Sequence, residues 1–298
     1  MRNAIANAII KKAQIDPKLF LISGDAGLGV WDSFKESKQY INPGINEALC
    51  VGMAAGMALR GYRAIYYNIA PFVIMRPYEQ VRNDICYQEL PVILIGTGSG
   101  VTYAPAGMTH YAIEDIALAL TCPNLDIFSP ADPLEAREAF EYAYKSNKPS
   151  YIRVPKAGEP FLHRDENVDI TLPQILHKGK DVLVISHSGM VGETLKAAEI
   201  LSSEGISAQI VSLPMITTKN PKLDELLNFS GEIFVVEEHF ERGGLGSLLT
   251  EKREINKIAL PNEYIHAVGN QSYIREYYGI NAQAIVQKIE KKLRGSRG

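Results

Sequence analysis

The sequence predicts an α/β fold with two domains, each a mostly parallel sheet flanked by helices. Apolar, β-rich runs alternate with segments of helical periodicity, which is typical of parallel sheets covered by helices. The strand-like runs are apolar almost throughout, as strands buried on both faces must be. The alternation stops once at a polar stretch and then resumes, and 298 residues are enough for about two domains.

The first domain is expected over residues 1–157, where strands and helices alternate. Strands are expected at Leu19–Gly24, Ala64–Asn68, Pro91–Gly96, Leu125–Ser129 and Ser150–Val154. Helices are expected at residues 2–14, 45–60, 76–89, 112–121 and 132–146. In such a fold the carboxyl ends of parallel strands share one edge, and ligands of open α/β sheets bind there.

A linker is expected over residues 158–177, which are polar and rich in turn formers. The second domain follows at residues 178–298. Its strands are expected at Asp181–Ser186, Ala208–Leu213, Ile233–Glu237 and Tyr264–Ala267. Its helices are expected at residues 189–204, 220–228, 243–254 and 281–294.

Composition excludes several classes of protein. The formal net charge is −3 and 22% of residues are charged, so nucleic-acid binding has little electrostatic support. No window is apolar over about 18 residues, and the start does not resemble a secretory signal, so we expect a cytoplasmic protein that binds no membrane. Cys50, Cys86 and Cys122 lack CxxC spacing and are expected to be reduced packing residues. The histidines show no HxH or HExxH spacing, so no metal site is expected.

The most informative segment is Asn42–Glu47 with the helix that it opens. Residues 48–59 are small or apolar and carry no charge, which predicts a buried helix whose backbone approaches other elements closely. Glu47 then lies in the first turn of a buried helix. It is either a carboxylate that interacts with the helix dipole or a buried carboxyl that binds a ligand nitrogen.

Four other sites are candidates by position. Asp25 lies in a glycine-rich loop after a strand, which is either a phosphate-binding loop or a plain turn. The aromatic side chains of Tyr67 and Phe72, near the end of a strand, can stack on a flat heterocycle or belong to the core. His110 precedes a helix and can act as an acid, a base or a hydrogen-bond donor. Arg153, at the end of a strand, can hold an anionic group or pair with a carboxylate.

Six segments together resemble the C-terminal half of the thiamine-diphosphate-dependent transketolase family. They read SGDAGLG, PGINEALCVGMAAGMAL, YYNIAPF, GMTHYAIEDIAL, YIRVPK and VVEEHFERGGLGSLL. The resemblance covers essentially the whole chain. It implies a pyrimidine-binding domain followed by a transketolase C-terminal domain, and transfer of a two-carbon ketol unit from a ketose to an aldose.

The resemblance also assigns residues to the cofactor thiamine diphosphate. Glu47 matches the glutamate that hydrogen-bonds N1′ of the aminopyrimidine and so activates the cofactor. Phe72 matches the aromatic residue that stacks on this ring, with Tyr67 nearby. Asp25 matches the aspartate of the first strand–loop of the family.

For the substrate, the resemblance implies that His110 contacts donor oxygens and that Arg2 and Arg153 hold a sugar phosphate. Two polar residues of transketolases that act on sugar phosphates are missing. A histidine is absent near Gly98, and Ala106 stands where the family has an acidic residue. A different acceptor, such as a modified or nucleotide-linked sugar, therefore remains open.

One signature of full-length transketolases is absent, namely Gly-Asp-Gly followed at a distance by Asn. Its nearest match is Gly24-Asp25-Ala26, which lacks the third glycine. Because Mg²⁺ requires oxygen ligands in a fixed geometry, we expect a separate N-terminal subunit to bind the diphosphate and Mg²⁺. The expected assembly is a split enzyme, an α₂β₂ heterotetramer.

Three alternatives remain open at this stage. Two are related enzymes, a half of a deoxyxylulose-phosphate synthase and a β subunit of a 2-oxo-acid dehydrogenase. The third is a non-catalytic binding or regulatory subunit that keeps the fold.

Overall fold

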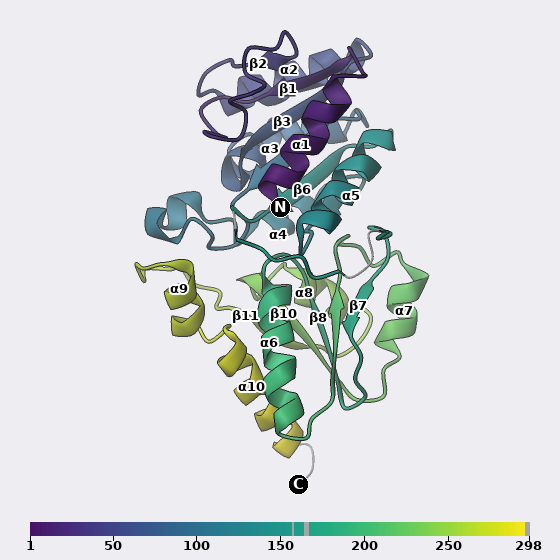
Figure 1. The fold of residues 1–298 in the computed structure, drawn as a ribbon, viewed down its shortest axis with the longest axis vertical. Coiled ribbons are helices and arrows are strands. Elements are labelled where there is room, and N and C mark those ends of the chain that lie inside the picture. The colour runs from purple at the N-terminus through teal and green to yellow at the C-terminus, as the bar shows by residue number, and fades with distance from the viewer. Residues whose placement is uncertain (157, 164–166, 296–298) are drawn as a thin grey trace.

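Six parallel strands form the sheet of the first domain, in the order β2-β1-β3-β4-β6-β5. Their bounds are β1 Leu19–Ile22, β2 Tyr40–Ile41, β3 Arg63–Ile69, β4 Ile93–Thr97, β5 Asp126–Phe128 and β6 Ser150–Val154. The computed structural model describes residues 1–156, 158–163 and 167–295. Residue 157, where the first domain is expected to end, lies outside them. The two-domain α/β fold is confirmed (Figure 1).

Helices cover both faces of this sheet. They are α1 Arg2–Ala13, α2 Glu47–Leu59, α3 Tyr78–Gln80, α4 Asp115–Leu120 and α5 Pro133–Lys145. Helices α1 and α5 lie side by side (Figure 1) and share an apolar cluster with Leu21 and Ile65. The next residues along β3 and β1, Tyr66 and Ile22, face α2 instead. Side chains alternate along a strand, which is why the strands are apolar almost throughout.

The segment after β3 is π-helical rather than α-helical. It consists of the π-helices Pro71–Met75 and Val81–Cys86, with α3 between them. Pro77 lacks a backbone N–H and stands directly before α3, so the helix expected over residues 76–89 begins at Tyr78 and continues as a π-helix to Cys86. Short π-helices occur frequently at functional sites.

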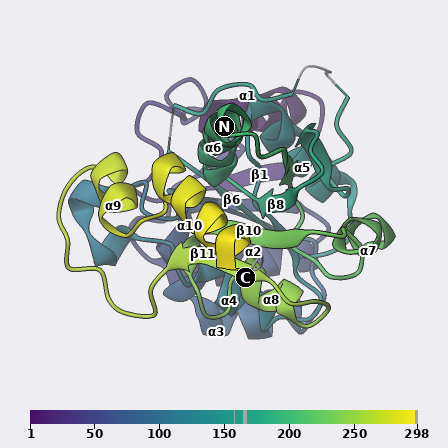
Figure 2. The same cartoon turned by 90° about the horizontal axis from the view of Figure 1, so that it is seen from below.

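The second sheet is mixed, in the order β11-β10-β8-β9-β7. Its strands are β7 Gln174–His177, β8 Val182–Ser186, β9 Ala208–Ser212, β10 Glu232–Phe240 and β11 Asn256–Leu260. Only β7 runs antiparallel to its neighbour among the described residues. The helices are α6 Met190–Ser203, α7 Pro221–Leu227, α8 Leu245–Thr250, α9 Gln271–Tyr277 and α10 Ala282–Gly295. Figure 2 shows α10 beside α6.

One expected strand is wrong. Residues Tyr264–Ala267 form no strand, and the last strand of the sheet is β11. The segment Tyr-Ile-His-Ala alternates like a strand, but only Ile265 is buried, whereas Tyr264 is 70% exposed. Strand β7 comes from residues expected in the linker. Its side chains are intermediate or exposed, so it has no apolar run to reveal it.

The carboxyl ends of the two sheets face each other. Backbone hydrogen bonds join Ser129 N to Pro214 O at 2.7 Å and Ile216 N to Ile127 O at 2.9 Å. Phe240, at the end of β10, donates to Ile113 O at 2.9 Å. One apolar cluster continues from α2 through α4 into the second domain. The loops at the carboxyl ends of the first sheet therefore pack against the second domain.

The described part of the linker is anchored to α5. Asp132, the N-cap of α5, accepts hydrogen bonds from Leu162 N and His163 N as well as from the helix. His163 Nε2 lies 2.8 Å from Glu135 Oε1, and Glu135 also contacts Ser212 of the second domain. Burial lowers the pKa of His163, but the hydrogen bond and charge of Glu135 outweigh it, so this pKa is raised from 6.5.

Replacing His163 with Gln is expected to remove a pH-dependent part of the stability. A raised folded-state pKa contributes stability that is fully present below pH 6.5 and is lost as the pH rises through the raised value. The difference from wild type should be about 1–2 kcal/mol in mild acid and smaller in alkali. Urea denaturation across this range measures it, with exposed His266→Gln as the control. An equal difference at every pH would contradict the assignment.

No described helix has both the length and the apolar character needed to cross a bilayer.

Candidate functional site

Glu47 is the first residue of α2, and local sequence explains its position. The side chain of Asn46 caps the helix by accepting a hydrogen bond from Leu49 N at 3.2 Å, as N-cap residues do. The small residues that follow let α2 pack closely on β3, and the Glu47 side chain is only 7% exposed. Its Oε1 lies 2.6 Å from NH1 of Arg76. Glu47 is thus a buried carboxylate in the first turn of α2, paired with a half-exposed arginine.

Phe72 lies on the first π-helix and Arg76 directly follows this helix. The hydroxyl of Tyr66 donates to Phe72 O at 3.2 Å, which fixes the start of this segment. The guanidinium carbon of Arg76 lies 4.1 Å from the centre of the Phe72 ring, a cation–π contact. Arg76 therefore joins Glu47 to Phe72. We call the space that its guanidinium fills the Glu47–Phe72 slot.

His110 also packs against Phe72 and is the last residue of the 3₁₀ turn Met108–His110. Its ring centre is 5.4 Å from that of Phe72, edge to face, and its Nδ1 lies 2.9 Å from Thr109 Oγ1. Gly107, with φ +72°, lets the chain turn into this segment. His110 is half-buried, so its Nε2 can reach a ligand beside the slot.

A second group of polar side chains gathers around Tyr67. Within the described chain, Arg2 Nε, Trp31 Nε1, Tyr67 OH and Thr97 Oγ1 are buried without a hydrogen bond of normal geometry. Trp31 meets Tyr67 edge to face at 5.0 Å. Burial raises the pKa of Tyr67, and the nearby charge of Arg2 opposes this. Each of the four atoms can donate a hydrogen bond, so the group suits an anion or a polyol.

Tyr103 connects this group to His110. Its ring lies 6.2 Å from that of His110, and Lys156 Nζ lies 5.0 Å from its centre. The charge of Arg2 acts on the Tyr103 hydroxyl and lowers its pKa against the larger effect of burial. The charges of Arg2 and Lys156 thus both act on Tyr103, the ring that lies next to His110.

Asp25 follows β1 and is exposed. Its loop is close to Tyr67, because a side chain at Gly27 would meet Trp31 Nε1 at 2.5 Å and Tyr67 at 3.1 Å. The role assigned to Asp25 stays a prediction.

Arg153 is placed differently from the sequence expectation. It is 1% exposed, and its Nε donates to Asp115 Oδ2 at 2.7 Å. Its NH2 donates to Ala112 O at 2.9 Å and its NH1 to Ser129 Oγ at 3.1 Å. Every nitrogen of the guanidinium is used inside the protein, so Arg153 supports the His110 segment rather than presenting a charge to a ligand. Of the two roles considered for Arg153, the structure shows pairing with a carboxylate, that of Asp115.

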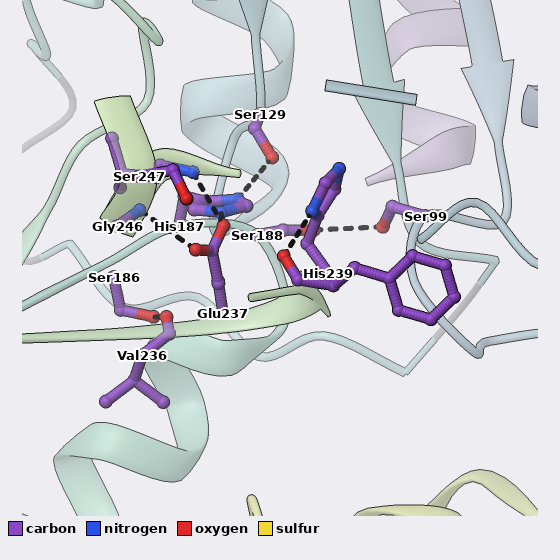
Figure 3. A network of polar contacts seen from close by, with 12 residues as sticks. Ser99, Ser129, Ser186, His187, Ser188, Val236, Glu237, His239, Gly246 and Ser247 are labelled. Carbon is purple, nitrogen blue, oxygen red and sulfur yellow. Dashed lines mark hydrogen bonds and ion pairs between the residues drawn. The ribbon is translucent and has the colours of Figure 1, made fainter. Parts of the chain in front are cut away.

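A buried polar network continues from Arg153 through Ser129 into the second domain. Figure 3 shows its part from Ser129 through His187 to Glu237. Ser129 Oγ accepts from Arg153 NH1 at 3.1 Å and lies 2.8 Å from His187 Nδ1. Burial lowers the pKa of His187, and its Nε2 lies 3.6 Å from Glu237 Oε2. Glu237 accepts from Leu245 N and Gly246 N at the start of α8.

The network has consequences for the site loops. Ser99 Oγ, after β4, lies 2.9 Å from Ser188 Oγ (Figure 3), and Val101 N donates to Glu238 Oε2 at 3.1 Å. The start of the loop from β4 to His110 is thus held by the second domain. The C-terminal domain therefore positions the site although it supplies no residue of the slot.

Sequence reasoning missed four residues of this constellation: Arg76, Trp31, Tyr103 and Lys156. Arg76 is the one charged residue in the segment Ile69–Pro77. Lys156 follows the strand that contains Arg153, two residues after its end. Both positions can be noticed in the sequence, but neither residue type nor spacing shows which residues Arg76 and Lys156 contact.

The cysteines are free and buried, as expected. The described residues contain no cluster of His, Cys, Asp or Glu suited to a metal ion.

Comparison with known proteins matches both domains. The transketolase pyrimidine-binding domain family covers residues 1–158, and the transketolase C-terminal domain family covers residues 173–285. A subunit of the apulose-4-phosphate transketolase of Actinobacillus succinogenes is 33% identical over 83% of this chain and 82% of that protein. A 1-deoxy-D-xylulose-5-phosphate synthase of Dictyoglomus thermophilum is 30% identical, and the match spans 85% of this chain but 42% of that protein.

Solved structures give the same result. A split-gene transketolase, described as an inactive beta4 tetramer, superposes with a TM-score of 0.87 at 28% identity over 97% of both chains. A transketolase of Pichia stipitis has the same fold, with a TM-score of 0.88 at 20% identity over 46% of its length. This chain therefore belongs to the transketolase family, and its two domains are the pyrimidine-binding and C-terminal domains of that family.

Proposed function

We propose that this chain is the C-terminal subunit of a split, thiamine-diphosphate-dependent transketolase that moves a two-carbon ketol unit from a ketose to an aldose. The observation that carries the proposal is the Glu47–Phe72 slot. A buried carboxylate and an aromatic ring flank a space that a flat, nitrogen-rich group already fills. The aminopyrimidine of thiamine diphosphate is flat and nitrogen-rich too, so the donor set fits it.

When bound, thiamine diphosphate supplies a nucleophilic carbon and an electron sink for breaking a bond beside a ketone. Glu47 would bind the ring nitrogen and exchange a proton with it, and its burial strengthens that hydrogen bond. Phe72 would stack on the ring. His110, 5.4 Å from Phe72, would hydrogen-bond an oxygen of the ketose near the bond that breaks.

A partner subunit would hold the diphosphate and Mg²⁺, and its docking surface is the outer face of α2. The sequence predicts a helix buried on nearly every face, yet Leu49 is 47% exposed and Leu59 is 62% exposed. Ile45, two residues before Glu47, is 70% exposed, and Leu28, in the loop after β1, is 90% exposed. Contiguous exposed apolar side chains mark interaction sites. We propose a heterotetramer with two copies of each subunit, consistent with relatives that are named as subunits.

The substrate class follows from the charges around Tyr103. Arg2 and Lys156 would hold the phosphate of a phosphorylated sugar, in place of the histidine and acidic residue that the family has near Gly98 and Ala106. The related subunits named for apulose 4-phosphate favour a phosphorylated ketose. Arg153 has no part in this contact because its guanidinium is buried and paired.

Replacing Arg2 or Lys156 with Met is expected to raise KM for a phosphorylated substrate by roughly 10- to 100-fold, since a hydrogen bond to a charged group contributes about 1.5–3 kcal/mol. KM for the unphosphorylated sugar should hardly change. Steady-state kinetics of the complex measure both, with the exposed Lys178→Met as the matched control. Equal losses for both sugars would rule out phosphate binding.

The function itself is tested by reconstitution with the diphosphate-binding partner. Exchange between a ketose phosphate and an aldose phosphate is the expected activity. Decarboxylation of pyruvate without exchange would instead indicate a deoxyxylulose-phosphate synthase or a 2-oxo-acid dehydrogenase subunit. If the complex forms but turns over neither substrate, the chain is a binding or regulatory subunit.

A further inference from the structure

Arg76 makes two contacts that the proposed function reserves for the cofactor. Its NH1 lies 2.6 Å from Glu47 Oε1, and its guanidinium carbon lies 4.1 Å from the centre of the Phe72 ring. A guanidinium is planar, with N–H donors along its edge. It can therefore bond a carboxylate at its edge and present its face to an aromatic ring at the same time.

An aminopyrimidine bound by Glu47 and stacked on Phe72 would need the same two contacts. Glu47 Oε1 already has a donor at close range, and the Glu47 side chain is 7% exposed, so little of the carboxylate remains open. Two flat groups cannot fill one slot. Cofactor binding therefore requires Arg76 to leave.

We infer that Arg76 is a placeholder, whose guanidinium fills the Glu47–Phe72 slot until the aminopyrimidine of the cofactor displaces it. The inference rests on the proposed function. Before loading, Arg76 neutralises a buried carboxylate and covers an aromatic ring. After loading, the cofactor ring takes over both contacts, and Arg76 turns toward solvent.

The position of Arg76 makes this exchange feasible. Its side chain is 52% exposed, so a change of rotamer brings the charge into water. Its backbone N–H donates to Pro71 O at 3.0 Å, so the backbone can stay in place while the side chain moves. Phe72 is held separately, through the bond from Tyr66 to its carbonyl.

The same contacts predict a cost to cofactor affinity. The apparent affinity for a ligand falls with the fraction of protein whose site is open. Breaking a half-exposed ion pair together with a cation–π contact is expected to lower the apparent affinity for the cofactor by a factor of roughly 5 to 30. Removing the guanidinium should strengthen cofactor binding by that factor. Removing a side chain that binds the cofactor ring, Glu47 or Phe72, should weaken cofactor binding.

The test is calorimetric titration of thiamine diphosphate, with Mg²⁺, into the complex with the partner subunit. Arg76→Met keeps most of the side-chain length but lacks the charge and the donors, and we expect the Kd to fall about 5- to 30-fold. Arg76→Lys keeps the charge without the planar face and should bind with an intermediate Kd. Arg82→Met, an exposed arginine on the next π-helix, is the matched control and should match wild type.

Two companion variants separate this inference from the proposed function. Phe72→Ala and Glu47→Gln should both weaken cofactor binding if the slot holds the ring. If they do so while Arg76→Met leaves the Kd unchanged or raises it, Arg76 is not a placeholder and the inference is overturned. If Phe72→Ala and Glu47→Gln leave the Kd unchanged, the cofactor ring binds elsewhere and the proposed function fails. Should Arg76→Met not assemble, the Kd of Arg76→Lys decides by the same comparison.

Discussion

Replacing Glu47 with Gln is expected to lower kcat for ketol transfer by roughly 10²- to 10⁴-fold, the range for loss of a positioned acid–base group. Gln keeps the shape and can still hydrogen-bond a ring nitrogen, but it cannot exchange a proton with it. The side chain is 7% exposed, so water cannot easily take over this task. Steady-state kinetics of the reconstituted complex measure the loss.

The control for Glu47→Gln is Glu225→Gln. Glu225 is a surface carboxylate of the second domain, and its Oε2 lies 3.0 Å from Lys222 Nζ. The Glu225→Gln variant therefore also loses an ion pair, but at a position outside the domain that contains the slot. Its kcat should equal that of wild type. If Glu47→Gln keeps full activity at saturating cofactor, Glu47 is a structural cap and the catalytic assignment is wrong.

Replacing Arg153 with Met is expected to reduce the free energy of unfolding by about 3–5 kcal/mol, the range for breaking a buried ion pair. Asp115 is 0% exposed and would keep a charge with no cation beside it. Ala112 O and Ser129 Oγ would lose their donors as well. Urea denaturation of the purified chain measures the change.

A second substitution shows whether the loss of stability in Arg153→Met comes from the unpaired charge of Asp115 or from lost packing. Adding Asp115→Leu to Arg153→Met removes the stranded carboxylate, so much of the stability should return. Lys222→Met is the surface control, because the side chains of Lys222 and Glu225 are 60% and 65% exposed, and such pairs contribute about 0–1 kcal/mol. If the double variant is no more stable than Arg153→Met, the uncompensated charge is not the cause.

The course of α2 illustrates what local sequence can predict. Asn46 caps the helix, small residues follow, and the absence of charge indicates burial, so both the helix and the place of Glu47 could be derived. The sequence could not say that one face of α2 stays exposed in this chain. We propose that the partner subunit covers that face, and the composition of α2 contains no information about a second polypeptide.

Arg153 illustrates the opposite case. Its place at the carboxyl edge of a parallel sheet was predicted, but the direction of its side chain was not. That direction depends on Asp115, Ala112 and Ser129, which come from other segments and meet only when the strands are in register. A charge at a sheet edge therefore has two readings until its partner is known.

Three features of this protein could be predicted from local sequence: the two α/β domains, the alternation of strands and helices, and the glutamate at the start of a small-residue helix. These features depend on side-chain periodicity and capping, which act over a few neighbouring residues. Three other features become visible only in the folded chain: Arg76 bridges Glu47 and Phe72, Lys156 joins Arg2 beside Tyr103, and Arg153 is internal. Such pairings depend on contacts between residues distant in the chain, and electrostatic and stacking interactions act through space rather than along the sequence.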